Sequence, residues 1–342
     1  MSEEDLIAER RRKLDALAEL GIPAHNVDFK PDVTLDEAAQ LLRTAEVEAA
    51  AAGRELGDAG PVVAVAGRLA ALRDQGRSVF AHLEDEDGRL QLWLREDVLG
   101  AAAMALVRLL DLGDILGARG RLLRTRRGEP TVLVDQPTLL AKALRPPPDK
   151  YHGLHDQELR YRRRHADLLA SPSARRHFAT RSRIVASARE TLLQRGFLEV
   201  ETPVLQSIPG GGHARPFATH WNALDTDVYL RIALELHLKR LLVGGYRRVF
   251  EIGRVFRNEG LSPRHNPEFT MLEAYEAYGD YSSMRELTEA IVVGAARAAG
   301  APSSEAPDGD ASGANPLLRT YGGRPLDLTP PVRTARMVDL VA

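Results

Sequence analysis

The 342-residue chain is 44% hydrophobic and 27% charged, and its formal net charge is −2. This composition excludes disordered and collagen-like proteins, and the length predicts two or three domains. The sequence contains no cysteine, which excludes disulfide scaffolds, thiolate metal sites and cysteine nucleophiles. No stretch approaches about 18 apolar residues and the N-terminal residues are strongly charged, so we expect a cytoplasmic protein without a signal peptide or membrane anchor.

The charged residues are unevenly distributed along the chain. Residues 1–60 carry 14 acidic and 7 basic side chains, a net charge of −7. Residues 160–197 carry ten arginines and two acidic side chains, a net charge of +8. Such a basic segment suits a local anionic partner, but it is also what a solvated helix face shows. Taken alone, the charge pattern favours the solvated face.

The N-terminal part of the chain predicts two helices followed by a small β-barrel. The spacing of apolar residues predicts helices over 3–20 and 34–52. Residues 61–140 contain five short β-type runs separated by glycine-containing turns, and an alanine-rich helix over 96–110 lies between the third and fourth runs. This order predicts a closed five-stranded barrel of the oligonucleotide-binding type.

A larger α+β domain is expected to follow the barrel. Three consecutive prolines at 146–148 predict a stiff linker, and residues 301–316, which are poor in bulky apolar side chains, predict a surface loop. We therefore divide the chain into a helical extension, a barrel domain and an α+β domain, which cover residues 1–57, 58–145 and 146–342.

Three barrel residues lie where two adjacent strands present them on one surface: Arg73, Phe80 and Gln91. An exposed ring beside a cation and an amide suits an unpaired nucleotide, because the ring stacks on the base, the amide reads its edge and the cation attracts phosphate. A strand phenylalanine is more often a core residue, so the pattern alone favours packing. Trp93 is likewise expected to pack rather than to stack on a base.

A hairpin after the barrel carries a group of polar side chains. We expect strands over 249–259 and 268–278, joined by a polar loop over 260–267. Side chains alternate across a strand, so one face of the hairpin gathers a cation, two carboxylates and two aromatic rings: Arg257, Glu259, Phe269, Glu273 and Tyr275. His265 and Asn266 lie in the loop at the rim of this face.

This set of side chains suits nucleotide chemistry. Arginine neutralises the charge on a phosphate under attack, a phenylalanine ring stacks on a purine, and His265 and Asn266 can donate to outer phosphate oxygens. The sequence has no P-loop, and Gly210–Gly212 is followed by His-Ala-Arg-Pro rather than by a helix start, which argues against a Rossmann site. An exposed hairpin laced with salt bridges is the ordinary alternative, but two carboxylates and an arginine on one sheet face are costly without a ligand.

Several segments resemble the class II aminoacyl-tRNA synthetases. Residues 196–205 resemble motif 1 of that class, with Pro203 at its end, and residues 256–275 resemble motif 2. Within the class, four segments are similar to the lysyl-tRNA synthetases: RNEG, RHNPEFTMLE, GGGHARPF and YLRIALELHLKRLLVGG. The resemblance runs from about residue 6 to the end of the chain.

The resemblance implies an α+β protein in which an anticodon-binding barrel precedes a class II catalytic domain with an antiparallel sheet flanked by helices. It implies ATP-dependent activation of L-lysine to lysyl-adenylate and transfer of the lysine to tRNA(Lys), with Mg²⁺ as cofactor. The lysine carboxylate itself attacks the α-phosphate, so catalysis consists of positioning and charge neutralisation. Motif 1 implies a homodimer, and the basic stretch over 160–183 faces either tRNA or the dimer partner.

The resemblance also assigns nucleotide contacts to the hairpin residues. Arg257 is the catalytic residue and contacts both the α-phosphate and the lysine carboxylate. Glu259 contacts the adenine side, and Phe269 stacks on the base. His265 and Asn266 reach the phosphate or other nucleotide groups.

Lysine and tRNA contacts follow from the same resemblance. The Gly211 carbonyl and Glu235 hold the α-ammonium group of lysine, and Glu273 with Tyr275 holds the ε-ammonium group. Buried carboxylates reject neutral side chains, because the carboxylate charge would then lack a partner. The anticodon contacts of the family match three barrel residues, which reverses the packing interpretation given above: Arg73, Phe80 and Gln91.

The sequence departs from the family pattern at three places. Glycine stands at 212 where the family has alanine, and leucine at 234 where it has proline; we expect small effects on the shape of the pocket. Motif 3 is missing. We therefore expect the magnesium ligands, a further lysine-binding carboxylate and the motif 3 arginine to lie beyond Ala342, and this incomplete form to activate lysine poorly or not at all.

Two alternative functions remain open at this point. The first is a ligase that attaches lysine to a protein such as elongation factor P, but such relatives lack the barrel over 61–140. The second is a non-catalytic tRNA-binding or regulatory protein derived from a synthetase. The missing motif 3 supports it, and the intact set of hairpin residues argues against it.

Overall fold

The computed structural model describes residues 2–86, 88–148, 156–260, 262, 264–300 and 315–341. The chain divides into two compact units, Met1–Arg175 and Arg176–Ala342. The three-part division expected from the sequence stays a prediction. The predicted surface loop over 301–316 lies outside the described residues, apart from its last two positions.

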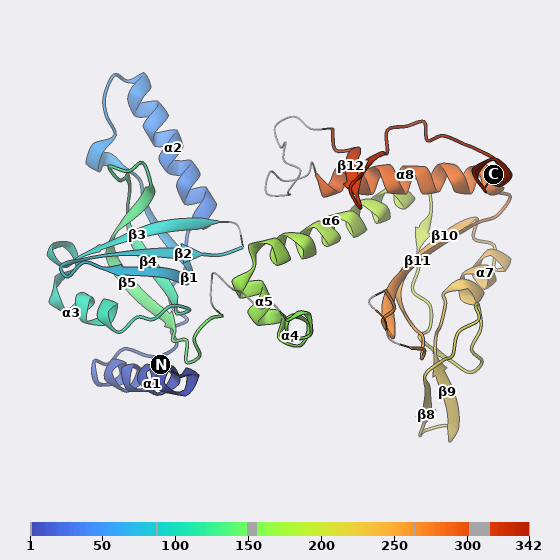
Figure 1. The fold of residues 1–342 in the computed structure, drawn as a ribbon, viewed down its shortest axis with the longest axis horizontal. Coiled ribbons are helices and arrows are strands. Elements are labelled where there is room, and N and C mark those ends of the chain that lie inside the picture. The colour runs from blue at the N-terminus through green and yellow to red at the C-terminus, as the bar shows by residue number, and fades with distance from the viewer. Residues whose placement is uncertain are drawn as a thin grey trace. The chain divides into compact units, whose positions relative to one another are not determined.

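The first unit is built around a closed five-stranded barrel with the strand order β1-β2-β3-β5-β4 (Figure 1). Strands β3 and β5 pair in parallel, and the other neighbours pair antiparallel. The barrel strands are β1 (Val62–Asp74), β2 (Ser78–Glu84), β3 (Arg89–Arg95), β4 (Ile115–Arg124) and β5 (Pro130–Ala141). Helix α3 (Glu96–Arg108) lies between β3 and β4 in the sequence, so the predicted barrel is confirmed.

Two N-terminal helices pack on the barrel core. Helix α1 (Glu3–Glu19) begins at a capping box between Ser2 and Asp5, and α2 (Leu35–Ala51) begins at one between Thr34 and Glu37. A short 3₁₀-helix, η1 (Gly57–Ala59), follows α2. Apolar residues of both helices join one continuous cluster with the inward-facing strand residues. Both predicted helices are therefore confirmed.

A buried charge cluster fixes α1 to the end of the barrel. The Lys142 ammonium group donates to Asp111 at 2.6 Å and to Asp114 at 2.8 Å, and the side chains of Lys142 and Asp114 are 1% and 0% exposed. Lys13 of α1 also donates to Asp111 at 2.6 Å. Arg10 of α1 donates to three backbone carbonyls near the end of the barrel: Leu112, Ala143 and Arg145.

Some arginines of the arginine-rich stretch form ion pairs within the fold. The stretch comprises α4 (Gln157–Arg162), α5 (Arg164–Ala170) and the start of α6 (Pro172–Gln194). Asp167 is 2% exposed and accepts hydrogen bonds from Arg160, at 2.8 Å, and from Arg164. These two arginines therefore have a structural role, and the choice between tRNA and a dimer partner for the rest stays a prediction.

The second unit contains a three-stranded sheet with the order β11-β10-β6. Strands β10 (Arg248–Phe256) and β11 (Glu268–Glu276) pair antiparallel, and β6 (Leu198–Glu199) pairs in parallel with β10. A second sheet joins β7 (Leu205–Gln206), β9 (Thr226–Leu230) and β8 (Ala218–Trp221). The remaining elements are α7 (Glu235–Val243), α8 (Tyr281–Ala299), β12 (Leu318–Tyr321), β13 (Arg324–Asp327) and α9 (Met337–Val341).

The two faces of the β10–β11 hairpin pack on different helices. Figure 1 shows α7 beside one face, and α6 and α8 beside the other. Val249 and Val255 pack with α7, whereas Phe250 packs with Leu192 of α6 and Leu287 of α8. The alternation predicted for these strands is therefore confirmed, because odd and even positions of β10 lie in different clusters.

The predicted ends of both hairpin strands need correction, since β11 ends at Glu276 rather than at 278. Strand β10 ends at Phe256 rather than at 259, so Arg257 and Glu259 lie beyond the strand. The Arg257 N–H still donates to the Pro267 carbonyl at 2.8 Å, which extends the ladder by one bond. Glu259 lies further along the exposed loop and does not continue the strand face.

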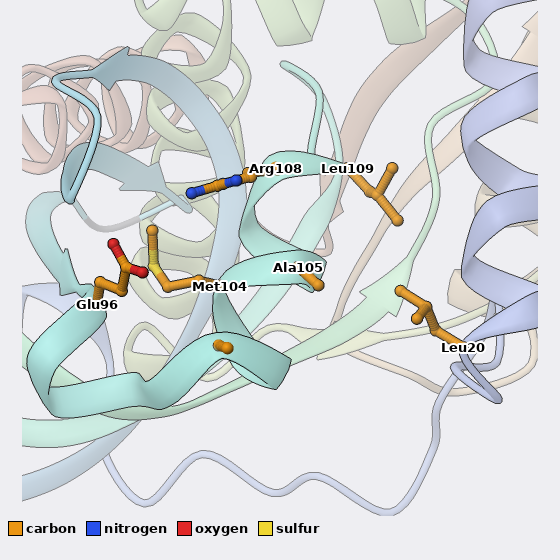
Figure 2. Close-up of a pocket in the computed structure, with 7 residues that line it drawn as sticks. Leu20, Glu96, Met104, Ala105, Arg108 and Leu109 are labelled. Carbon is orange, nitrogen blue, oxygen red and sulfur yellow. The ribbon is translucent and has the colours of Figure 1, made fainter.

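None of the described helices is long and apolar enough to cross a membrane. The first unit carries a hollow of about 340 Å³ beside α3. Figure 2 shows Leu20, at the end of α1, facing this helix, with Met104, Ala105 and Leu109 around the hollow. Glu96 and Arg108 also line it, and all its lining residues belong to the barrel unit.

Replacing Lys142 by methionine should destabilise the barrel unit. The change leaves the Asp114 carboxylate buried without its ammonium partner, a loss of about 3–5 kcal/mol in the free energy of unfolding. Arg124→Met is the control, because Arg124 pairs with a partly exposed Glu46 and should cost about 1 kcal/mol or less. Urea unfolding of both variants measures the difference.

The stability difference should also depend on pH. Burial opposes ionisation of Asp111, but hydrogen bonds from Lys13 and Lys142 hold the pKa of this carboxyl below its usual value of 3.8. A lowered pKa stabilises the fold above the unfolded pKa, and this contribution is lost as the pH falls through the folded pKa. The gap between the wild type and Lys142→Met should therefore shrink below about pH 4; a gap independent of pH would contradict this assignment.

Candidate active site and nucleic-acid interface

Arg257 lies at the end of β10, between an aromatic ring and a backbone carbonyl. Its Nε donates to the Ile232 carbonyl at 3.3 Å, and its guanidinium carbon lies 5.2 Å from the centroid of the Phe269 ring. Phe269 is opposite Val255 in the β10–β11 register. The cation is therefore held beside an aromatic plane at the edge of the sheet, and both side chains are only half-buried.

A glutamate at the start of α7 lies against the glycine loop. Glu235 is the first residue of α7, where the helix dipole favours a negative charge. A Cβ on Gly211, which has a φ of +85°, would lie 3.0 Å from the Cβ of Ala233 and 3.2 Å from the Cβ of Glu235. The glycine therefore allows both the left-handed backbone and this close approach. Lys239, one turn further along α7, forms an ion pair with Glu235.

A second carboxylate lies on β11 beside the same helix. Glu273 Oε1 accepts from the Leu234 N–H at 3.1 Å, and its Oε2 accepts from the Tyr275 hydroxyl at 2.8 Å. Lys239 Nζ lies 5.9 Å from the Tyr275 ring centroid. Burial raises the pKa of the Tyr275 phenol well above its ordinary 10.0, and the hydrogen bond to Glu273 and the charges of Glu273 and Glu235 raise this pKa further. Tyr275 therefore stays a hydrogen-bond donor at neutral pH.

The predicted loop residues lie apart from this group of buried contacts. Glu259, His265 and Asn266 are all exposed. The His265 ring nitrogen Nδ1 lies 2.7 Å from the Ser262 hydroxyl, and the two residues form an isolated β-bridge. The structure therefore brings Arg257, Phe269, Glu273 and Tyr275 to one surface and leaves the loop residues at its open rim.

The arrangement separates two kinds of charge. Two carboxylates and a phenol lie beside α7, and they suit a cationic ligand. A guanidinium group and an aromatic ring lie at the end of β10, and they suit an anionic group attached to a flat ring. The surface can therefore bind an ammonium group beside α7 and an anionic group, such as a carboxylate or a phosphate, at the end of β10. The two groups can belong to one molecule or to two.

Two of the departures from the family pattern, Gly212 and Leu234, remove no contact from this surface. A Cβ on Gly212 would meet no atom within 4 Å, so the missing methyl group leaves no gap. Leu234 is 1% exposed, and its N–H, which a proline would lack, donates to Glu273. The leucine therefore adds a hydrogen bond to the site.

The outer face of the barrel carries a stacked pair of aromatic rings. Phe80 is opposite both Arg73 of β1 and Trp93 of β3. The Phe80 and Trp93 rings lie 5.5 Å apart with an interplanar angle of 15°, and the Arg95 guanidinium lies 4.9 Å from the Trp93 ring. Trp93 Nε1 donates to the Ser78 hydroxyl at 2.6 Å. Trp93 is half-buried on the outer face, against the Phe80 ring, and the expectation that it packs rather than stacks on a base stays a prediction.

Gln91 shares this face but is not presented as a free amide. It is 7% exposed; its Nε2 donates to Glu129 at 2.7 Å, and its Oε1 accepts from the Thr131 hydroxyl at 2.9 Å. Glu129 also lies 2.7 Å from His82 Nε2. The expectation that Gln91 presents an open amide is therefore corrected. Its amide is held by Glu129 and Thr131, and the Glu129 side chain is half-exposed.

Two family models match this chain. A family model described as tRNA synthetases class II (D, K and N) matches residues 156–336, which is more than half of the chain. The chain belongs to this class II family. A second model, described as an OB-fold nucleic acid binding domain, matches residues 63–140, the region of the barrel.

Three relatives illustrate the similarity of this class II chain to other members. It is 49% identical to the lysine–tRNA ligase of Moorella thermoacetica over 340 residues, covering 99% of the chain and 64% of that protein. Identity to the lysine–tRNA ligase of Magnetococcus marinus is 52%, covering 85% of the chain and 57% of that protein. Identity to the lysine–tRNA ligase of Shouchella clausii is 45%, covering 98% of the chain and 63% of that protein. The chain thus spans less than two thirds of the length of these relatives.

Sequence reasoning missed several residues that contact the predicted ones. The spacing of Lys239, four residues after Glu235, was the signal that could have found it. The contacts of Ile232 and Leu234 with the site are made by backbone atoms, which no side-chain pattern reveals. His82 and Glu129 come from different parts of the barrel sequence, and the fold alone brings them together.

Alkaline titration should show the effect of Glu273 on Tyr275. In Glu273→Gln the phenol loses a negatively charged neighbour, so its pKa should fall and phenolate absorbance should appear at lower pH than in the wild type. Glu276→Gln, on the same strand, is the control and should leave the Tyr275 titration unchanged. Tyr275→Phe identifies the absorbance change that belongs to this residue. Identical curves for the wild type and Glu273→Gln would contradict the assignment.

Proposed function

We propose that this class II chain carries the lysine-activating and tRNA-binding surfaces of a lysine–tRNA ligase. The reaction is ATP-dependent formation of lysyl-adenylate, followed by transfer of the lysine to tRNA(Lys). Its relatives that are named lysine–tRNA ligases support this choice, as does the matched class II family. The proposed substrates and partners are L-lysine, ATP and tRNA(Lys).

The observation that carries the proposal is the pair of carboxylates beside α7. Glu273 is fixed by the Leu234 N–H and the Tyr275 hydroxyl, so its orientation is set before a ligand binds. We propose that Glu273 and Tyr275 hold the ε-ammonium group of lysine, and that Glu235 and the Gly211 carbonyl hold the α-ammonium group. The neutral side chain of asparagine would leave the Glu273 charge without a partner, and the carboxylate of aspartate would be repelled by it, which selects lysine against both.

Arg257 is the proposed catalytic residue of the activation step. An oxygen of the lysine carboxylate forms a bond to the α-phosphorus of ATP, and the bond from that phosphorus to the bridging oxygen breaks and releases pyrophosphate. The guanidinium group contacts the carboxylate and the α-phosphate, so it brings two anions together and neutralises the charge that develops. The ribose hydroxyl at the end of the tRNA then attacks the carbonyl carbon, and AMP leaves.

The adenosine part of ATP is proposed to lie along the hairpin. Phe269 offers a ring beside Arg257 on which the base stacks. Glu259 is proposed for the adenine side, and His265 and Asn266 for the phosphates; their exposure leaves these side chains accessible to ATP.

The barrel face is proposed to bind the anticodon. Phe80 supplies a stacking plane and Arg73 a cation. Gln91 is proposed as the third residue of this face, with its amide already held by Glu129 and Thr131. We also propose a homodimer formed through motif 1, supported by apolar side chains that are exposed at its strands, Leu198 and Leu205. The proposed location is the cytoplasm, where protein synthesis takes place.

Mg²⁺ is proposed as the counter-ion of the ATP phosphates. Within the described part of the chain, no three histidine or acidic side chains are grouped so that they could hold a metal ion. We therefore assign no metal ligand to these residues and no step of the reaction to a metal that they would bind.

The central test measures amino-acid-dependent ATP–pyrophosphate exchange by the full-length gene product. Lysine should support exchange, and aspartate and asparagine should not. Charging of tRNA(Lys) with labelled lysine tests the second step. Exchange with aspartate or asparagine but not with lysine would overturn the assignment of the substrate. Charging of the tRNA without a preference for lysine would overturn the proposal that Glu235 and Glu273 hold the two ammonium groups of lysine.

Replacing Arg257 by alanine should reduce exchange by about 100-fold or more, because one group that neutralises transition-state charge is lost. Binding of tRNA(Lys) should stay within about twofold of the wild type, because the barrel face is unchanged. Arg254→Ala is the matched control: it removes an exposed arginine from the same strand and should leave exchange unchanged. Equal losses of exchange and tRNA binding in Arg257→Ala would show that Arg257 is structural.

Replacing Phe80 by alanine should weaken tRNA charging and spare exchange. The loss of one stacking plane should raise the KM for tRNA about tenfold, since base stacking is worth about 1–3 kcal/mol. Phe80→Tyr keeps the ring and should behave as the wild type in both assays. An unchanged KM for tRNA in Phe80→Ala would remove this residue from the anticodon site.

A further inference from the structure

The short segment over 231–235 connects β9 to α7 and supplies backbone atoms to the proposed site. The Ile232 carbonyl accepts from Arg257, and the Leu234 N–H donates to Glu273. Both contacts require the segment to lie at a fixed distance from β10 and β11. The question is which group holds it there.

Arg231 anchors the start of this segment. Its Nε donates to the Arg254 carbonyl of β10 at 2.8 Å, and its Nη1 donates to the Thr202 carbonyl at 2.9 Å. The backbone carbonyl of Arg231 accepts from the Phe256 N–H at 2.9 Å, directly before Arg257. One residue thus ties the segment to the end of β10 and to Thr202, which lies in the stretch that resembles motif 1.

Arg231 is itself held by a buried glutamate. Its Nη1 donates to Glu251 Oε1 at 2.7 Å, and the two side chains are 4% and 5% exposed. The Thr202 hydroxyl donates to the other oxygen of Glu251 at 2.6 Å. A Cβ on Gly253 would lie 2.4 Å from Arg231 Nη2, so only glycine leaves room for the guanidinium group.

The pair also has an electrostatic effect on the site. Glu251 is directly opposite Glu273 in the β10–β11 register. Like charges at opposite positions destabilise a strand pair, and Arg231 neutralises the Glu251 charge. Glu273 can then remain the carboxylate that is available to a cationic ligand.

A buried ion pair is a costly way to gain stability alone, since apolar residues of similar size can do as well. We propose that Arg231, held by Glu251, is a positioning residue: it fixes the 231–235 segment so that Ile232 and Leu234 orient Arg257 and Glu273. This inference rests on the proposed function for its catalytic readout. The planar fork of arginine is required because it reaches Arg254, Thr202 and Glu251 at once.

The test compares two arginine-to-lysine variants of the full-length gene product. Arg231→Lys keeps the charge beside Glu251 and loses the fork. The matched control is Arg248→Lys at the other end of β10, where Arg248 donates to the Arg195 carbonyl and to Glu276. Thermal unfolding is measured for both variants. The concentration of active sites is determined from the burst of adenylate formation, and the rate of ATP–pyrophosphate exchange is divided by it.

We expect Arg231→Lys to lower kcat per active site about tenfold or more, because a small misplacement of a catalytic group is costly. Arg248→Lys should stay within about twofold of the wild type. Amide hydrogen exchange should accelerate in Arg231→Lys at Leu234, Phe256 and Arg257 more than elsewhere in the unit, and Arg248→Lys should not show this local effect.

An unchanged kcat per active site in Arg231→Lys would overturn the proposal and leave Arg231 a purely structural residue. Equal changes in both variants would do the same. Amide hydrogen exchange needs no substrate. It therefore decides whether Arg231 fixes the segment even if lysine does not support ATP–pyrophosphate exchange. Absence of lysine-dependent exchange in the wild type would instead overturn the proposed function.

Discussion

The register of the β10–β11 pair is the constraint on which the second unit depends. It places Phe269 opposite Val255 and Glu273 opposite Glu251, so the odd-numbered side chains share one face. A shift by one residue would turn Phe269, Glu273 and Tyr275 toward α6 and α8, into the apolar cluster around Phe250. The apolar residues on both faces therefore fix the position of the polar ones, and the site exists because the core excludes any other register.

The same register creates an electrostatic problem and its solution. It sets two carboxylates across from each other, and the fold gives each a different environment. Glu251 is buried and paired with Arg231, while Glu273 accepts from two neutral donors, the Leu234 N–H and the Tyr275 hydroxyl. A chemically identical pair is thus divided into one structural carboxylate and one that can accept a cation.

The sequence predicted much of this fold because its patterns were local. The spacing of apolar residues over 3–20 and 34–52, and an alternating pattern in the strands, predict elements from neighbouring residues. The end of β10 was not predicted, because Arg257 and Glu259 continue the polar alternation after the strand has stopped. The side of the barrel on which Trp93 lies was not predicted for a related reason: a strand aromatic can face either the core or the solvent, and only pairing with Phe80 decides which.

The sequence by itself determined the family, the barrel, the hairpin and the types of side chain at each surface, because these depend on residue identity and spacing. Tertiary structure alone decided that the Gln91 amide is held by Glu129 and Thr131, and that Arg231 is buried against Glu251. Each of these contacts joins residues 20 or more positions apart. Their geometry follows from how strands and loops pack in space, and no local pattern in the chain records it.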